Sequence, residues 1–308
     1  MRRSSKWVRQ RLNTGRVKLE RGIILRSRVV FHADDLGLTE SINLGILQAI
    51  QYGLVRSTSI MGCGRAFTHA TALLDGQSVC TGVHLTLDEE TPVCTPSDVP
   101  SLVGQDGRFH SRATLMRKLT LSRQIDLSEV RMELEAQITK CLDAGIRVSH
   151  LDGHGHIHAH PRVAPIVVDL ANKFGLKCIR VPNEPLTYVG AGVDPRRQLN
   201  KLIVLTMTIF SAKIFRRSGL ASPAMFLGIS HGGRVTTSAI RKMVDFGSRG
   251  SLFEIMCHPG KLSEELKADY GYWDYSWDSE LRALMSDEIK EYVVNICDVV
   301  SLREAYFE

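Results

Sequence analysis

The sequence predicts an α/β fold in which parallel strands alternate with helical crossovers, arranged as a distorted (β/α) barrel of the TIM-barrel type. Two observations lead to this prediction. Short β-rich apolar segments alternate with amphipathic segments along the whole chain, which is the pattern of repeated βαβ units. Aspartate and histidine side chains follow several of the predicted strands, and folds of this class gather their chemistry at the carboxyl ends of strands.

The first half of the chain alternates strands and helices around one long loop. Thr39 offers an N-cap for a helix that Gly53 would close. Residues 88–110 contain three prolines and two glycines, so we expect a long loop, and such loops in compact domains usually carry function. Strands are expected at residues 28–33, 56–61, 79–87 and 148–151, and helices at residues 39–52, 66–74 and 127–144.

The second half continues this alternation and finishes with a strand and a helix. Gly175 ends one predicted helix, and Pro182 breaks the strand that follows it. A loop rich in aromatic residues, 270–277, is expected to cap the barrel. Strands are expected at residues 177–181, 226–230 and 251–257, and helices at residues 162–174, 202–215, 238–246 and 278–292.

The charge of the chain is concentrated at its beginning. The 308 residues include 39 basic and 33 acidic side chains, and residues 1–28 hold ten of the basic ones with a single acid, Glu20. We therefore expect residues 1–27 to form a flexible basic extension, and residues 28–308 to form a single, nearly neutral barrel domain. A nearly neutral body argues against nucleic acid as the main partner.

Cysteine usage and the absence of a signal sequence favour a cytoplasmic protein. The seven cysteines are scattered and form no CxxC pair, which argues against a thiolate zinc site and is typical of reduced thiols. No long apolar segment follows the basic residues at the start of the chain, so we do not interpret them as a secretory signal.

A second basic stretch, residues 196–217, encloses an apolar segment at residues 202–215. This segment carries Lys213 and is shorter than the about 20 residues that span a bilayer. Two interpretations stay open, a buried helix and a helix lying at a membrane surface. Peripheral membrane contact through residues 1–28 and 196–217, and association as a homodimer, are further hypotheses about partners. The basic residues that would flank a surface helix are Arg197, Lys201, Arg216 and Arg217.

Five histidines and one aspartate lie between His150 and His160. In an extended segment alternate side chains share a face, which would align Asp152, His154, His156 and His158. Imidazoles beside a carboxylate are typical of a divalent metal site, although a histidine-rich surface loop that binds nothing is the alternative. Because one strand rarely encloses a metal ion, further ligands should come from other strands.

Three strand ends supply a plausible ligand set. One carboxylate of Asp34 or Asp35, the imidazole of His84 and one imidazole of the histidine-rich segment would provide one oxygen and two nitrogens. Three protein ligands leave room for water, which is the arrangement of catalytic sites. Either magnesium or zinc fits such a set. The second carboxylate could take a proton from the water, and His258 could protonate the leaving group.

Four segments resemble the YdjC/ChbG-like carbohydrate deacetylases. They are His32–Leu38, Thr81–Leu87, His150–His158 and Glu254–Pro259, and the resemblance extends over roughly residues 28–302. It implies a distorted (β/α) barrel and metal-dependent removal of an acetyl group from an N-acetylated sugar or glycan. The reaction would proceed by attack of a metal-bound water on the amide carbonyl.

The resemblance also implies roles for individual residues. Asp35, His84 and His154 would be the metal ligands, Asp34 the base and His258 the acid, although the roles of Asp34 and Asp35 could be exchanged. Arg180 would hold the base ionised through a charge-assisted hydrogen bond, or form a salt bridge without catalytic consequence. The expected substrate-binding residues are Arg180, His156 and His231, and the aromatic loop 270–277 could stack on sugar rings.

The chain departs from the family pattern at His32, where asparagine is common, and at Leu36, where phenylalanine is common. The basic extension has no counterpart there. Residues 180–185 and the basic helix after them are similar to the hopanoid-biosynthesis-associated branch, which implies a membrane-proximal or lipid-linked glycan as substrate.

Two other classes of function compete with a sugar deacetylase. Other metal-dependent amide or ester hydrolases use similar barrels but usually place an HxH pair on the first strand, whereas here the acidic pair comes first. A basic-tailed protein that binds RNA or membranes with a decayed site is the non-catalytic alternative, and the intact ligand set argues against it.

Overall fold

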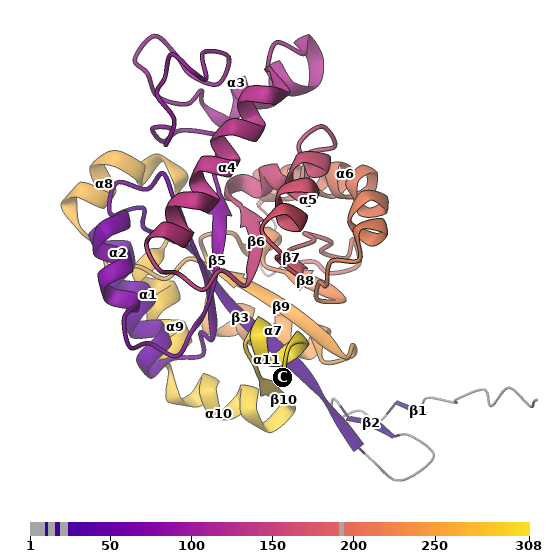
Figure 1. Cartoon of the computed structure of the whole chain (residues 1–308). Coiled ribbons are helices and arrows are strands. Elements are labelled where there is room, and N and C mark those ends of the chain that lie inside the picture. Colours follow the sequence, from indigo (N-terminus) through magenta and orange to yellow (C-terminus); the bar gives the residue numbers. More distant parts are fainter. Residues whose placement is uncertain (1–9, 12–15, 19–23, 191–193) are drawn as a thin grey trace, which may run out of the picture.

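The structure, a computed structural model, describes residues 10–11, 16–18, 24–190 and 194–308 (Figure 1). The predicted extension, residues 1–27, therefore lies largely outside the described residues. Within it, β1 (Gln10–Arg11) pairs with β2 (Arg16–Lys18), and β2 pairs antiparallel with the beginning of β3 (Ile24–Leu36). The first long strand thus starts earlier than residues 28–33 and continues through both aspartates of the acidic pair.

Parallel strands form the centre of the molecule and helices surround them (Figure 1). On one side of β3 follow β4, β5, β6 and β7; on the other side follow β9 and β8, and β10 pairs with the start of β3. A bridge between Cys178 and Ala221 links β7 to the segment that precedes β8. The prediction of a distorted (β/α) barrel is confirmed. The strands are β4 (Ser57–Ile60), β5 (Cys80–Leu85), β6 (His150–Gly153), β7 (Cys178–Ile179), β8 (Met225–Leu227), β9 (Leu252–Cys257) and β10 (Cys297–Val299).

The strands are buried on both faces because helices cover the outside of the barrel. Every residue of β4, β5 and β9 is buried, as expected for parallel strands under helical layers. Thr39 caps α1 by accepting from the backbone N–H of Ile42, as the sequence predicts. The larger helices are α1 (Glu40–Tyr52), α2 (Phe67–Leu74), α4 (Leu127–Asp143), α5 (Ala164–Lys173), α7 (Thr237–Gly247), α9 (Trp277–Met285) and α10 (Asp287–Ile296).

Several predicted elements differ in detail. The single helix expected at residues 278–292 is wrong: it is two helices, because Ser286 has extended dihedrals (φ −60°, ψ 123°) and begins a new helix with Asp287 and Glu288 in its first turn. The strand expected at residues 226–230 ends at Leu227 and becomes the short helix η3 (Ile229–His231). Short helices not predicted from the sequence are α3 (Arg112–Arg117), η1 (Lys118–Ser122), α8 (Glu264–Tyr270) and η4 (Gly271–Trp273), whereas the final helix α11 (Leu302–Tyr306) follows the last strand as predicted.

The histidine-rich segment is not extended, so the prediction that its side chains share one face is wrong. β6 ends at Gly153, and the chain then coils into the short helix η2 (His154–Ala159). Gly155 (φ 54°) and His156 (φ 61°) adopt left-handed dihedrals inside it, which glycine accepts readily and other residues rarely adopt. The imidazoles therefore leave the backbone in different directions.

The apolar segment at residues 202–215 lies within α6 (Pro195–Ser218). Asp194 caps the start of this helix and Gly219, with φ 75°, ends it. One face, which includes Val204, Met207 and Phe215, is buried, so the interpretation as a buried helix is correct for that face. None of the helices in the described part of the chain is long and apolar enough to cross a membrane.

A close contact between two glycines fixes the loop that follows β9 against α1. A Cβ atom on Gly45 would lie 2.4 Å from the Cα of Gly260, where no side-chain atom fits. We therefore expect Gly45→Ala to lower the free energy of unfolding by about 1–3 kcal/mol through overpacking. Chemical denaturation measures this change. The control is Gly271→Ala, at a position with helical dihedrals (φ −55°) and no neighbour within 4 Å; equal effects of both substitutions would contradict the prediction.

Candidate metal centre and active site

A bulge at the end of β3 turns the two neighbouring aspartates toward different partners. The register between β3 and β4 shifts between Ala33 and Leu36, and Asp35 has a left-handed φ of 68°. Such a conformation is strained for a residue other than glycine, and it clusters at functional sites. Because bulges re-aim side chains, Asp34 faces Arg180 whereas Asp35 faces His84 and His154.

Asp35, His84 and His154 form a compact buried cluster. Oδ1 of Asp35 lies 3.0 Å from Nδ1 of His154 and 3.2 Å from Nε2 of His84. One ligand atom from each residue lies within 4.8 Å of the others. Among the described residues, Oδ2 of Asp35 has no hydrogen-bond partner although it is buried. A carboxylate with one oxygen beside two imidazoles and the other oxygen unpaired fits a divalent cation, so the cluster has the donor set of a metal site.

The carboxylate of Asp152 orients His84 toward this cluster. Oδ1 of Asp152 shares a hydrogen bond of 2.9 Å with Nδ1 of His84, and Ser59 donates to Oδ2 of Asp152. Metal-ligating histidines usually have such a partner on the other ring nitrogen. Burial alone would lower the pKa of His84, but Asp152, Asp35 and Asp34 outweigh burial and raise it to about 10. A proton on His84 therefore balances part of the negative charge.

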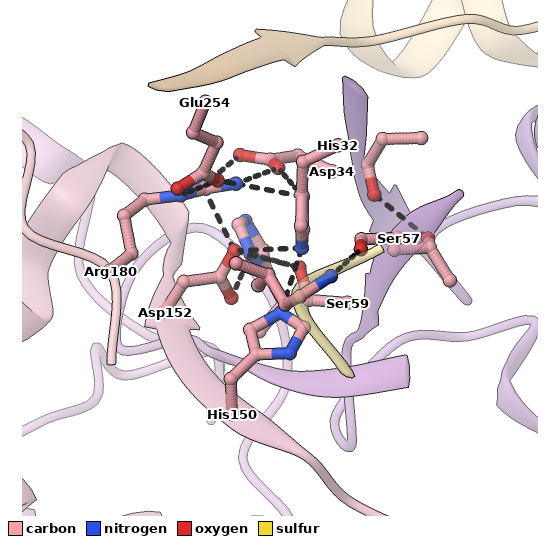
Figure 2. Close-up of polar contacts among 12 residues, drawn as sticks. His32, Asp34, Ser57, Ser59, His150, Asp152, Arg180 and Glu254 are labelled. Atoms are coloured by element: carbon pink, nitrogen blue, oxygen red, sulfur yellow. Dashed lines mark hydrogen bonds and ion pairs between the residues drawn. The ribbon is translucent and has the colours of Figure 1, made fainter. Parts of the chain in front are cut away.

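Arg180 lies at the centre of a second cluster, shown in Figure 2. Its guanidinium donates to both oxygens of Asp34 (2.6 and 2.8 Å), forms an ion pair with Asp152 (2.9 Å) and donates to Glu254 (2.8 Å). Burial would raise the pKa of Asp34, but Arg180 and His32 hold it well below its ordinary value. Asp34 is therefore ionised at neutral pH, and Arg180 is only 2% exposed, with its donors directed at carboxylates.

Two other groups of three side chains also bring ligand atoms within 4.8 Å of one another. They are His32, His150 and Asp152, and Asp34, His84 and Asp152. Asp34 and Asp152 both face the Arg180 guanidinium, so a cation in either group would meet a positive charge at close range. In the third group, Asp35 pairs with His84 and His154 but, among the described residues, with no arginine or lysine.

His32 and His150 adjoin the Arg180 cluster. Their Nε2 atoms are 2.8 Å apart, and Nδ1 of His32 lies 2.8 Å from Oδ1 of Asp34 (Figure 2). The neighbouring strand admits the ring of His150 because residue 82 is glycine; a Cβ atom there would lie 2.4 Å from Nε2 of His150. Burial and the neighbouring His32 lower the pKa of His150 to about 3, so this ring is neutral.

His258 follows β9 and lies near the cluster of Asp35, His84 and His154. Its backbone N–H donates to Oε2 of Glu280 at 2.6 Å, and its ring packs against Tyr275 with centroids 4.9 Å apart. Burial lowers its pKa, although the charges of Asp35 and Asp34 partly oppose this effect. Nδ1 of His258 is buried without a partner among the described residues. The side chain is thus held in place with a ring nitrogen free to exchange a proton.

The remaining histidines of the predicted site have different surroundings. Nε2 of His158 donates to the carbonyl oxygen of Arg180 at 3.0 Å, which fixes the end of β7. His156 is buried and packs edge-on against Phe226. His231 shares a hydrogen bond of 2.6 Å with the hydroxyl of Tyr188. The structure therefore brings Asp34, Asp35, His84, His154, Arg180 and His258 together, whereas His156 and His231 contact other groups.

Aromatic residues of the loop 270–277 lie over the candidate metal site. The ring of Trp273 is 5.1 Å from that of His154. Glu89 joins this loop to the long loop 88–110, because it accepts hydrogen bonds from Trp273 Nε1 (3.0 Å) and Tyr272 (2.9 Å). Tyr270 donates to Glu90 at 2.6 Å. The two loops thus form one cover over the carboxyl ends of the strands.

Three residues of the site were not predicted as functional from the sequence: Ser59, Asp152 and Glu254. Glu254 offered a signal, because it is an acid inside the apolar strand expected at residues 251–257, and a buried charge requires a partner. Asp152 was noticed only as a neighbour of the histidines, and its role depends on the pairing of β5 with β6. Ser59 gave no signal that separates it from other strand residues.

A hollow of about 1030 Å³ opens at the opposite end of the strands. Arg56, Arg147 and Arg303 line it, together with Asp75 and Glu304. Asp35, His84 and His154 do not line this hollow, so it is separate from the candidate active site.

Comparisons with known proteins show which families and structures the chain resembles. The family of YdjC-like proteins matches residues 28–295. A carbohydrate deacetylase from Brevibacillus brevis is 30% identical over 86% of this chain and 94% of its own length. One from Listeria monocytogenes is 27% identical over 90% of this chain and 99% of its own length. A crystal structure of a protein from Enterococcus faecalis superposes with a TM-score of 0.71, at 24% identity over 91% of this chain and 98% of that one, which supports the fold.

We expect metal affinity to rise with pH, because His84 must lose a proton before it can bind a cation. With its pKa raised to about 10, apparent affinity should increase by up to about tenfold per pH unit between roughly pH 6 and 8. Isothermal titration of metal-free protein in buffers of different ionisation enthalpy measures both the affinity and the released proton. Binding that is independent of pH would contradict a protonated His84.

Asp152→Asn should weaken metal binding by roughly 10–100-fold, since the partner that orients His84 loses its charge. The same change removes the main cause of the raised pKa of His84, so the dependence of affinity on pH should also flatten. Asp287→Asn is the control, because that side chain is 98% exposed and lies on α10. If the Asp152 variant binds metal as tightly as the control does, the orienting role is wrong.

Proposed function

The chain belongs to the YdjC-like protein family, and we propose that it is a metal-dependent carbohydrate deacetylase that hydrolyses the amide of an N-acetylated sugar or glycan. Two relatives that carry this name align over most of the chain. The observation that carries the proposal is the buried Asp35–His84–His154 cluster beside an ionised Asp34. We infer from its O,N,N donor set that the ion is magnesium or zinc.

In this proposal Asp35, His84 and His154 hold the ion. When bound, such an ion lowers the pKa of water and polarises a carbonyl oxygen. Asp34 lies next in the chain and keeps its negative charge at neutral pH because Arg180 pairs with both of its oxygens. An ionised carboxylate in a fixed position can accept the proton of the attacking water, which is the role of a general base.

His258 is the proposed proton donor to the nitrogen that leaves. Burial lowers its pKa, so this ring is a stronger acid than an exposed imidazole but carries a proton in a smaller fraction of molecules. Glu280 accepts from the backbone N–H of His258 and of Val235 and thereby anchors the segment. The base and the acid then come from different strands, β3 and β9, which pair directly.

Arg180 is better placed to position Asp34 than to touch a substrate. Its side chain is surrounded by Asp34, Asp152 and Glu254 and is almost completely buried. We therefore propose that it keeps the base ionised and oriented. The roles of His156 and His231 in substrate binding stay predictions, and so does a membrane-proximal or lipid-linked glycan as the substrate.

The test of the proposal is release of acetate from N-acetylglucosamine oligosaccharides and from lipid-linked glycans, with magnesium or zinc and with chelator. We expect release that chelator abolishes and that one of the two metals restores. Absence of release from every N-acetylated substrate, together with hydrolysis of a phosphoester or an unrelated amide, would overturn the assignment.

Asp34→Asn should retain the metal and lose turnover by roughly 10²–10⁴-fold, since the base is removed. Asp35→Asn, in the adjacent position, should instead lose metal binding. Metal content after dialysis and the rate of acetate release separate the two effects. The reverse result, metal lost from the Asp34 variant and kept by the Asp35 variant, would exchange the two roles.

Trp273 is proposed as a wall against which the sugar ring packs, because it is half-buried beside His154. Trp273→Ala should raise KM by up to about tenfold, the upper end of what an aromatic contact contributes, with a smaller change in kcat. Trp273→Phe keeps an aromatic face and should retain most of the affinity. An unchanged KM in the alanine variant would show that Trp273 only covers the site.

A further inference from the structure

The outward face of α6 is apolar although the inward face already packs against the barrel. Five large apolar side chains on this helix are 45–71% exposed. Pairs of them are spaced three, four or seven residues apart, which places them on one side of the helix. They are Leu199 (60%), Leu202 (51%), Ile203 (45%), Ile209 (71%) and Phe210 (66%). Scattered exposed apolar residues are ordinary, but a contiguous apolar patch marks an interaction site.

The segment before α6 also carries exposed apolar side chains. Leu186 is 67% exposed and Val189 is 60% exposed. Lys201, on the inward side of α6, donates to the carbonyl oxygens of Pro185 (2.9 Å) and Tyr188 (2.6 Å), which ties this segment to the helix. Lys201 is 2% exposed and pairs with Glu184. The prediction that it flanks a helix at a membrane surface is therefore wrong, because it is buried and joins α6 to the segment before it.

Positive charges border the apolar residues, and no acidic residue occurs in the 24 residues of α6. Arg196 lies at one end of the exposed stripe, and Lys213, Arg216 and Arg217 lie at the other. These four side chains are exposed, and none forms an ion pair with another described residue. Arg197, which was also expected to flank a surface helix, is turned inward and contacts the carbonyl of Gly232.

We propose that α6 lies flat on an anionic lipid bilayer, with its apolar stripe in the interface and its basic ends against the headgroups. An apolar face with a basic border is the pattern of interfacial helices, and lysines and arginines near such a surface are attracted by anionic lipids. A second copy of this chain is a poorer partner. Self-pairing through a two-fold axis would bring the same positive border of each copy together, and like charges across an interface are unfavourable.

This orientation would bring the membrane close to the candidate active site. α6 starts after the segment that follows β7, and its buried side supports site elements. Phe215 stacks on His158, whose Nε2 donates to the carbonyl of Arg180. Arg197 near the start of the helix contacts the loop that carries His231. With the bilayer on one face of α6 and the site elements on the other, the carboxyl ends of the strands would lie close to molecules held at the membrane surface.

The experiment compares binding of the full chain to vesicles of phosphatidylcholine and to vesicles that also contain phosphatidylglycerol. We expect sedimentation with the anionic vesicles. The double variant Ile209→Ser, Phe210→Ser should bind roughly tenfold or more weakly. The matched control is Tyr52→Ser, Leu121→Ser, which removes two side chains that are 60% and 79% exposed outside α6; it should bind as the unmodified protein does. Acetate release from a water-soluble oligosaccharide should be the same in both variants.

A tryptophan probe distinguishes α6 from the basic residues 1–28. Residues 1–28 contain Trp7, so the probe is placed in a Trp7→Phe background. There Phe210→Trp should show a blue-shifted emission with anionic vesicles and quenching by brominated lipid chains, which electrostatic attachment through the start of the chain alone would not produce. Two results would overturn the proposal. One is vesicle binding that the double substitution does not weaken, together with no blue shift in the Phe210→Trp variant. This result would assign binding to residues 1–28. The other is a dimer, detected by light scattering, that the double substitution abolishes, while the unmodified protein does not bind vesicles. This result would assign the stripe to a second copy of the chain.

Discussion

One guanidinium among three buried carboxylates organises the centre of this protein. Arg180 follows β7 and pairs with Asp34 on β3, Asp152 on β6 and Glu254 on β9. Such a group is stable only when its charges are all paired, and loss of one partner from a buried ion pair typically costs about 3–5 kcal/mol. The pairing therefore joins strand ends that are distant in the sequence, and it holds the ionised Asp34 beside Asp35, a member of the candidate metal site.

The adjacent aspartates belong to one site because the backbone between them is irregular. In a regular strand they would point to opposite faces, and Asp35 would lie away from His84. The register shift and the left-handed φ of 68° bring Asp35 into the same region from another direction. This strained backbone is held by the buried pairs on either side of it: Asp34 with Arg180, and Asp35 with the two imidazoles. Conformation and chemistry are thus fixed by the same contacts.

The sequence was sufficient to predict the barrel and the strand ends that carry the acidic pair, His84 and His154, because strand periodicity and residue type are local properties. It was not sufficient for the bulge at Asp35 or the coil at His154, since both depend on glycines and tertiary contacts that override the extended pattern. Asp152 and Glu254 acquire their roles only from strand pairing. The exposure of Phe210 was also unpredictable, because composition cannot tell which face of an apolar helix meets the barrel.

The link between His84 and Asp152 has a consequence for how the protein is assembled in the cell. While the cluster holds no ion, the imidazolium that this pair favours offsets part of the surrounding negative charge, so the strand ends do not repel one another. If the protein binds a metal ion as proposed, its barrel would therefore be able to form before the ion is bound. Metal binding would then replace the proton on His84 by another cation inside a folded barrel, and folding would not depend on that step.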